Sequence, residues 1–424
     1  MKSIQLALAL IVILVFLGSS WQLLSALTAS VPKDAPLSPP AASQACTSFC
    51  LQNDGYCIFA TNFDSFTPEE MPGILYVNKR DVLKTGWEQS TTGEVARWTS
   101  RYGSVTFNLV GYQFPWAGMN EAGLIISTMS LVSLPPKPDA RPPLETEFWL
   151  QYQLDNYSSV EEVIASESQV RIVSKVLGCC HFLVCDRKGD CATVEMLNGK
   201  MVYHVGETLP VAALTNSIYA ESVKAWQERT PEELARVEES ALSLLRFTIA
   251  ADAVTRFQPT SSEAAVRVAL DTLARASIPD KIPNLTVWGL VFDAKNLRVY
   301  FRSRGNSQIR SIDFSRLDFA CSTPVLMLDI QADLAGDISD DLGTYDHDAS
   351  LDQIAFMFGN VGIAREQAEA LLLQLERFPC ADRKAHIVEG KPETPLWIWL
   401  IPAAALVIIS VDVWYRARKK VERT

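Results

Sequence analysis

The chain has no excess of positive charge, few histidines and no paired Cys-x-x-Cys motif, and each shortage excludes a class of protein. Its 38 lysines and arginines are outnumbered by 49 acidic residues, and the net charge of −11 argues against nucleic-acid binding. Without paired Cys-x-x-Cys motifs a zinc site is not expected, and the prediction is that the protein holds no metal. None of its four histidines has a helix-borne cysteine partner, which disfavours a conventional Cys–His thiol enzyme.

What is present is enough for a substantial core. The chain has 424 residues, of which 48% are hydrophobic and 21% are charged, as in a globular enzyme. This length fits one large domain or two small ones. No internal repeat is found, so repeat architectures are not expected.

Apolar segments lie near both ends of the chain. Residues 1–30 contain an apolar run after Lys2 and are predicted to be a signal peptide or an N-terminal anchor, followed by a pro-segment or linker over 31–45. Residues 395–415 form a second apolar run with tryptophans at its start, and a basic tail follows at 416–424. This pattern predicts a single transmembrane helix with a cytoplasmic tail. We therefore expect a cell-membrane protein whose main body is periplasmic or extracellular.

The order of strand-like and helical segments predicts an α+β protein. Strand patterns dominate the first part, beginning with a hairpin over 47–62 that turns at Asp54-Gly55. Helical patterns cover 144–166, 231–250 and 262–276, and strands return at 181–214 and 287–301. These blocks indicate segregated sheets and helices rather than a parallel fold. The main domain is predicted over 46–328, with a C-terminal helical appendage and linker over 329–394.

The nine cysteines suggest different roles. Cys50 and Cys57 are expected to face each other across the first hairpin. Cys179, Cys180, Cys185 and Cys191 lie close to His181, which raises the question of a metal site, but they fall within two predicted strands. Small buried cysteines pack well in a core, and that interpretation is preferred for this group.

Cys46 is the main candidate for chemistry. It follows Ala42-Ser43-Gln44-Ala45, a small-residue pattern that suits cleavage. Cleavage after Ala45 would give Cys46 a thiol and a free α-amine, which titrate near ~8.5 and ~7.7–8.0. One residue would then supply both nucleophile and base. An earlier cut near Ala26 or Ala29, followed by self-processing, is equally compatible.

Six segments along the chain form a recognisable series: Cys46-Thr47-Ser48-Phe49, Phe59-Ala60-Thr61-Asn62-Phe63-Asp64, Gly118-Met119-Asn120-Glu121-Ala122-Gly123-Leu124, Leu214-Thr215-Asn216-Ser217, Leu245-Arg246-Phe247 and the strand around Trp288. Together these segments resemble the choloylglycine hydrolases and penicillin V acylases. Their order and spacing cover roughly residues 46–325. The resemblance implies an N-terminal-nucleophile (Ntn) hydrolase with a four-layer αββα sandwich of antiparallel sheets.

The resemblance also implies roles for individual residues. Asp64 would hold the α-ammonium of Cys46, and the side-chain amide of Asn216 would bind the oxyanion. Arg246 would be an active-site cation that favours the Cys46 thiolate. Without the resemblance, a turn-capping aspartate, a loop asparagine and a structural arginine would be the default interpretations of these three residues.

The sequence departs from the family at two positions. Thr61 stands where the family commonly has an arginine and cannot supply that charge. Ser130 stands where bile-salt hydrolases have an asparagine, although its backbone amide can still contribute to an oxyanion hole. Both residues are candidates for oxyanion or substrate binding, and the departures affect substrate identity more than reaction type.

The predicted function is hydrolysis of a linear, non-peptide amide through a thioester on Cys46. The substrate would be a small N-acyl amide of the penicillin V, conjugated bile acid or acyl lactone type, and no cofactor is implied. Two alternatives stay open: a non-catalytic membrane-tethered binding or sensor domain on the same fold, and an acyltransferase. A homo-oligomer is compatible with the sequence.

Overall fold

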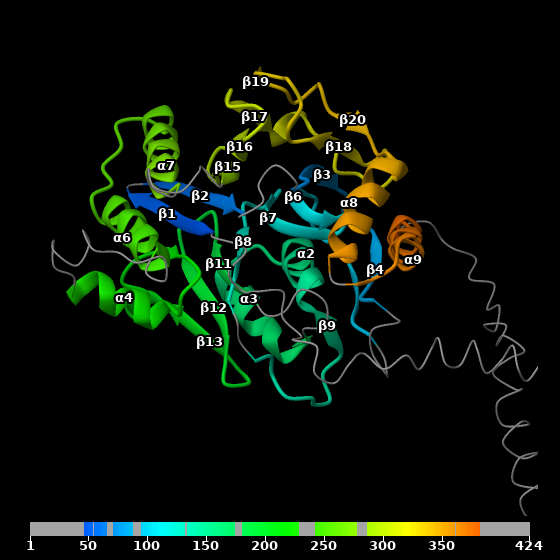
Figure 1. Ribbon diagram of the computed structural model, residues 1–424, viewed down its shortest axis with the longest axis horizontal. Coiled ribbons are helices and arrows are strands. Elements are labelled where there is room, and N and C mark those ends of the chain that lie inside the picture. Colours follow the sequence, from blue (N-terminus) through cyan, green and yellow to red (C-terminus); the bar gives the residue numbers. More distant parts are fainter. Residues whose placement is uncertain are drawn as a thin grey trace, which may run out of the picture. The chain divides into compact units, whose positions relative to one another are not determined.

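Two β-sheets lie face to face at the centre of the computed structural model, which describes residues 46–53, 55–65, 71–87, 95–131, 134–173, 180–228, 242–277, 286–360 and 362–381 (Figure 1). One sheet has seven strands in the order β14-β1-β2-β15-β16-β17-β19. The other has nine, in the order β13-β12-β11-β8-β7-β6-β3-β18-β20. All pairings in both sheets are antiparallel except β17 with β19. The predicted α+β class with antiparallel sheets is therefore confirmed.

The strands of the two sheets come from most of the described chain. Those of the seven-stranded sheet are β1 (Thr47–Asn53), β2 (Tyr56–Asp64), β14 (Ala213–Leu214), β15 (Thr286–Asp293), β16 (Arg298–Ser303), β17 (Arg310–Asp313) and β19 (Gly336–Asp337). Those of the nine-stranded sheet are β3 (Ile74–Asn78), β6 (Ser104–Gly111), β7 (Phe114–Asn120), β8 (Ile125–Ser130), β11 (Cys180–Cys185), β12 (Cys191–Leu197), β13 (Lys200–Val205), β18 (Leu326–Asp329) and β20 (Gly343–Thr344). Two small pairs, β4 (Leu83–Thr85) with β5 (Arg97–Thr99) and β9 (Pro143–Glu145) with β10 (Arg171–Val173), lie outside both.

Buried side chains fill the space between the two sheets. The Phe107 ring on β6 contacts Phe301 on β16, with ring centroids 5.2 Å apart. The Ser48 hydroxyl on β1 donates to the Ser127 hydroxyl on β8 at 3.2 Å. The hydrophobic effect and these buried contacts therefore hold the sheets together along their length.

Helices cover the outer face of each sheet. Helices α6 (Leu242–Thr255) and α7 (Ser262–Ala276) pack on β1 and β2, where the Asn62 side chain donates to the Leu273 carbonyl at 2.9 Å. Helices α2 (Thr146–Asn156) and α8 (His347–Gly359) pack on β7 and β6 of the other sheet. In the part of the chain that the structure describes, the remaining helices are α3 (Val160–Ala165), α4 (Tyr219–Glu228) and α9 (Arg365–Glu376), with short 3₁₀ turns η1 (Ser166–Ser168), η2 (Gly206–Thr208) and η4 (Phe314–Arg316).

The β1–β2 hairpin positions the candidate site because its side chains alternate between two environments. Ser48 on β1 faces the nine-stranded sheet, whereas Thr47 accepts a hydrogen bond from Arg246 on α6 at 3.0 Å. Register pairs Thr47 with Asn62 and Ser48 with Thr61, so neighbouring positions on β2 alternate in the same way. The beginning of β1 and the end of β2 therefore lie side by side.

Residues beyond 328 add to the main body. Strand β19 forms an edge of the seven-stranded sheet, strand β20 forms an edge of the nine-stranded sheet, and helix α8 packs on β6. The described residues up to Phe378 belong to one compact unit. Of the segment expected to form an appendage, the described residues between 329 and 378 therefore pack with the rest of the fold.

Among the described residues, no helix is long and apolar enough to cross a bilayer. The predicted signal or anchor segment (1–30), pro-segment (31–45), transmembrane helix (395–415) and basic tail (416–424) lie outside the described residues. One prediction about the cysteines is wrong: Cys185 and Cys191 form a disulfide rather than packing as reduced core residues. They are direct partners in the β11–β12 register, and sequence spacing alone did not reveal this pairing.

Candidate active site

Cys46 immediately precedes β1 and is fully buried. Its backbone N–H donates to Oδ1 of Asn216 at 2.7 Å. Its backbone carbonyl accepts a hydrogen bond from Nη1 of Arg246. The main chain at this cysteine is therefore held on both sides by side chains distant in sequence.

Arg246 is the buried cation of the site. It comes from α6, whose buried face packs on β1, and only 2% of the residue is exposed. Besides the Cys46 carbonyl, it donates to the Thr47 hydroxyl and, through Nη2, to Oδ1 of Asn216 at 3.0 Å. Burial lowers the pKa of Arg246, while Asp64 and Cys46 act in the opposite direction. The guanidinium thus links the cysteine, the asparagine and the first strand.

Asn216 follows the short strand β14 and has both ends of its side chain engaged. Oδ1 accepts from the Cys46 N–H and from Arg246, while Nδ2 donates to the backbone carbonyl of Ser130 at 3.0 Å. Its own backbone N–H donates to the Ser243 hydroxyl on α6 at 3.0 Å. The amide is therefore fixed in orientation, with Oδ1 toward Cys46 and Nδ2 toward the end of β8.

Asp64 ends β2 and is fully buried. Its Oδ1 accepts from the Thr286 hydroxyl at 2.7 Å, whereas Oδ2 has no hydrogen-bond partner among the described residues. Burial raises the pKa of Asp64 to about 6, and Arg246 and the Thr286 hydroxyl oppose that shift. A buried carboxylate oxygen without a hydrogen bond is costly to ionise, in keeping with the raised pKa of Asp64.

The Cys46 thiol is protonated in this arrangement. Burial raises its pKa to about 12, and Asp64 adds to the shift. Arg246 lowers the pKa, as do the Asp64 backbone N–H and the indole of Trp116 on β7. Burial outweighs the cation, so Arg246 alone does not produce a thiolate at neutral pH.

The structure brings four of the six predicted residues into one cluster, and a fifth, Ser130, contributes its backbone carbonyl. Cys46, Asp64, Asn216 and Arg246 interact directly or through electrostatics, and the Ser130 carbonyl accepts from Asn216. Thr61 takes a different part: its hydroxyl lies 2.8 Å from that of Ser48 and 2.9 Å from that of Ser127. These buried contacts join the two sheets.

Three supporting residues were not predicted from the sequence. Thr286 binds Asp64, Ser243 holds Asn216, and Trp116 lies near the sulfur of Cys46. Each comes from an element far along the chain from its partner. Each of the three lies two residues before one of the recognised segments, so a local signal existed for all of them.

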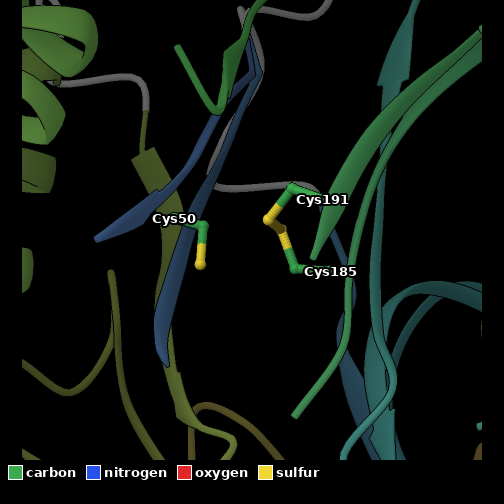
Figure 2. Close-up of side chains that lie close together, drawn as sticks. All are labelled: Cys50, Cys185 and Cys191. Carbon is green, nitrogen blue, oxygen red and sulfur yellow. A yellow bond between two sulfur atoms is a disulfide. The ribbon is translucent and has the colours of Figure 1, made fainter. Parts of the chain in front are cut away.

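A group of sulfur atoms is the closest match to a metal site among the described residues. The Sγ atoms of Cys50, Cys185 and Cys191 all lie within 4.8 Å of one another (Figure 2). Two of them are joined in a disulfide and offer no thiolate. His181 does not belong to this group, because its ring contacts Glu195 and the Thr215 carbonyl.

Comparisons with known proteins agree with the position of Cys46. Residues 46–255 match the profile of the linear amide C–N hydrolases of the choloylglycine hydrolase family, so the match begins at the candidate nucleophile. The chain is 25% identical over 319 residues to penicillin V acylase from Pectobacterium atrosepticum, covering 66% of this chain and 84% of that protein.

Solved structures resemble the fold along nearly their whole length. Penicillin V acylase from Agrobacterium tumefaciens has a TM-score of 0.60 and 25% identity, and the match covers 71% of this chain and 98% of that one. A single-residue variant of conjugated bile acid hydrolase from Clostridium perfringens has a TM-score of 0.54 and 19% identity, covering 67% and 97%. The second comparison supports the fold alone.

Proposed function

Since the chain belongs to the choloylglycine hydrolase family of linear amide C–N hydrolases, we propose that its mature form begins at Cys46 and uses that residue as the nucleophile. It is a hydrolase of non-peptide carbon–nitrogen bonds. The observation that carries the proposal is a pair of hydrogen bonds at the main chain of Cys46. Its N–H donates to Asn216, and its carbonyl accepts from Arg246. A site that holds the backbone nitrogen of a cysteine is suited to a reaction that uses this nitrogen.

Removal of residues 1–45 would activate the thiol. In the intact chain the Cys46 nitrogen is part of a peptide bond and cannot accept a proton. Cleavage would replace it with an amine, whose protonated form places a second positive charge beside the thiol and Arg246. Such a charge favours the thiolate and would lower the thiol pKa from its buried value of about 12. The partnerless Oδ2 of Asp64 is the expected acceptor for this ammonium.

The proposed reaction then proceeds in two stages. The Cys46 α-amine takes the thiol proton, and the sulfur attacks the acyl carbonyl carbon. Asn216 donates one Nδ2 hydrogen to the Ser130 carbonyl, and the second hydrogen, with the Ser130 backbone amide, would bind the oxyanion. The ammonium returns its proton to the leaving amine as the C–N bond breaks. Water, deprotonated by the α-amine, hydrolyses the thioester and regenerates the thiol.

We propose a small N-acyl amide as substrate, with phenoxyacetyl amides as the first candidates. Two relatives of this chain are penicillin V acylases at 25% identity, whereas the bile acid hydrolase structure is 19% identical. Bile-acid conjugates and acyl lactones are the other acyl classes to compare. Thr61, bound within the sheet interface, would act on substrate only indirectly.

The test is to pair mass spectrometry of the purified protein with an amide panel. We expect a mature N-terminus at Cys46 and amine release that Cys46→Ala abolishes. Cys57→Ala is the matched control, because Cys57 is equally buried but lies on β2 near the hairpin turn. Activity from a chain that still carries residues before Cys46, or from Cys46→Ala, would contradict the mechanism. Faster acyl transfer to an added amine than to water would indicate an acyltransferase.

We also propose that the enzyme lies outside the cytoplasm and is tethered by residues 395–415. The apolar run with a basic tail supports a membrane helix, and the Cys185–Cys191 disulfide is typical of an oxidising compartment. Protease added to cells whose outer membrane, where present, has been permeabilised should release the main domain from the cytoplasmic membrane. Protection of the domain until the cytoplasmic membrane is broken would contradict this location.

A further inference from the structure

His181 and Glu195 form a fully buried pair that the reaction scheme does not use. They lie on the adjacent strands β11 and β12 of the nine-stranded sheet, and both are 0% exposed. Nδ1 of His181 lies 3.1 Å from Oε1 of Glu195. Nε2 lies 2.6 Å from the backbone carbonyl of Thr215, the residue before Asn216. The ring therefore bridges one sheet to the segment that follows β14 of the other.

The contact with Thr215 determines where one ring proton lies. A carbonyl oxygen can only accept a hydrogen bond, so Nε2 carries a hydrogen and donates to Thr215.

The same pair holds both ends of the segment that carries Asn216. His181 binds the Thr215 carbonyl at one end. Oε1 of Glu195 accepts the backbone N–H of Tyr219, the first residue of α4, at 3.1 Å. Ser243 of α6 binds the Asn216 backbone N–H from the other side. The segment 215–219 is therefore clamped between the nine-stranded sheet and α6.

We infer that His181, supported by Glu195, is a positioning residue that fixes Asn216 for oxyanion binding. This inference rests on the proposed function, because it assigns Asn216 its catalytic role. An oxyanion donor that is displaced slightly loses much of its effect, since the bound geometry must match the transition state. Loss of the His181 hydrogen bond should therefore lower kcat more than it changes KM.

The variants His181→Leu and His181→Gln separate positioning from simple packing. Leucine removes the donor, whereas glutamine keeps an N–H that can reach the Thr215 carbonyl. We expect His181→Leu to lower kcat at least about tenfold, with KM changed less than about threefold, and His181→Gln to recover most of the loss. Gln353→Leu is the control: Gln353 is buried on α8 and donates to the Asn108 carbonyl at 2.5 Å, so it should lower Tm without changing kcat.

Hydrogen–deuterium exchange over residues 213–219 provides a second readout that does not require activity. Exchange should rise in His181→Leu, stay near the wild-type rate in His181→Gln and stay unchanged in Gln353→Leu. An unchanged kcat and exchange rate in His181→Leu, or equal losses in both His181 variants, would overturn the inference. If the wild-type protein hydrolyses no amide, the proposed function fails, while the exchange result still decides whether His181 holds the segment.

A second, independent observation concerns the sulfur cluster. Cys50 on β1 faces the Cys185–Cys191 disulfide of β11 and β12, and the three sulfur atoms lie within 4.8 Å of one another (Figure 2). The sulfur atoms of Cys50 and Cys57 are 3.6 Å apart. Nε2 of Gln52 donates to Sγ of Cys191 at 2.8 Å. A thiol therefore lies beside a disulfide, one sulfur of which already accepts a hydrogen bond.

We propose that this cluster is a thiol–disulfide exchange site that can move the covalent link to a position between the two sheets. The Cys50 sulfur attacks Sγ of Cys185, the Cys185–Cys191 bond breaks, and the proton of Cys50 ends on Cys191. Gln52 stabilises the departing Cys191 thiolate, which gives the exchange its direction. The reaction conserves both electrons and protons and needs no external oxidant.

Disulfide mapping of the full chain tests the exchange. After incubation at about pH 9, where more thiolate is present, acid quenching and alkylation should reveal Cys50–Cys185 peptides beside Cys185–Cys191 peptides. The new link closes a much longer loop, so the exchanged form should have the higher Tm. Cys50→Ser and Cys50→Ala should abolish both effects. Detection of Cys185–Cys191 alone would overturn the proposal, and a Cys50–Cys191 link would overturn the assigned direction.

Discussion

Two buried carboxylates of this protein, Asp64 and Asp155, differ in how completely their oxygens are satisfied. Asp155 on α2 forms an ion pair with Lys84 at 2.9 Å and accepts from the side chains of Trp98 at 2.7 Å and Gln151 at 2.8 Å. Asp64 accepts from Thr286, and its second oxygen has no hydrogen-bond partner among the described residues. A buried carboxylate whose oxygens all have hydrogen-bond or ion-pair partners stabilises the folded state. A buried carboxylate with one oxygen lacking a partner is suited to bind a further group.

The largest effect is expected at the satisfied carboxylate. Lys84→Met leaves Asp155 buried without its cation and should lower the free energy of unfolding by about 3–5 kcal/mol, measured by urea denaturation. Activity per folded molecule should stay the same, because Lys84 does not contact the site. The double variant Lys84→Met/Asp155→Leu should recover much of the stability. A stable single variant would show that the ion pair is not needed to bury Asp155.

Asp64 should show the opposite behaviour in the unprocessed chain. Its folded pKa of about 6 lies above the ordinary 3.8, so its ionisation lowers stability as pH rises from 3.8 through 6. In protein shown by mass spectrometry to retain residues before Cys46, Asp64→Asn should therefore raise the free energy of unfolding at neutral pH by on the order of 3 kcal/mol. The two curves should converge below pH 3.8. Equal stability at neutral pH would contradict the raised pKa.

The same substitution should impair the mature enzyme. Asp64→Asn removes the charge proposed to hold the α-ammonium, and misplacement of the reacting groups should lower kcat/KM by about a hundredfold. Amine-release kinetics on protein with a verified Cys46 N-terminus measure this effect. Activity near the wild-type value would remove Asp64 from the proposed mechanism.

The smallest effect concerns the hydroxyl that supports Asp64. In the wild-type protein the hydrogen bond from Thr286 to Oδ1 lowers the pKa of Asp64, and Thr286→Val removes this bond. That pKa should therefore rise, and the acidic limb of the pH–activity profile should move upward by about one unit. Thr248→Val, on α6, is a control at another buried threonine. A shift in both variants would indicate a general change of the fold rather than loss of this bond.

The family resemblance was sufficient to predict the residues that cluster around Cys46 but not their surroundings. Asp64, Asn216 and Arg246 could be predicted because each lies in a local segment that resembles the family, whereas the chain pattern alone favours structural roles for them. Thr286, Ser243 and the His181–Glu195 pair could not, since their importance depends on contacts between elements far apart in the sequence.

The same reasoning explains the errors and successes at cysteine. Cys50 and Cys57 face each other across the first hairpin as expected: they are diagonal neighbours in its register, and their sulfur atoms lie 3.6 Å apart. The Cys185–Cys191 disulfide was missed, although a turn between Asp186 and Asp190 closes that hairpin too. Strand spacing shows that two residues can be partners, but whether two sulfurs bond depends on register, which spacing does not determine.

The hydrogen bond from the Cys46 nitrogen to Asn216 exists while that nitrogen still belongs to a peptide. Under the proposed mechanism, the pocket is therefore assembled before its nucleophile is complete, and cleavage need not be followed by refolding. A cell could make and export such a protein in a dormant form and switch it on by a single cut. The timing of activity would then be set by that cut rather than by folding.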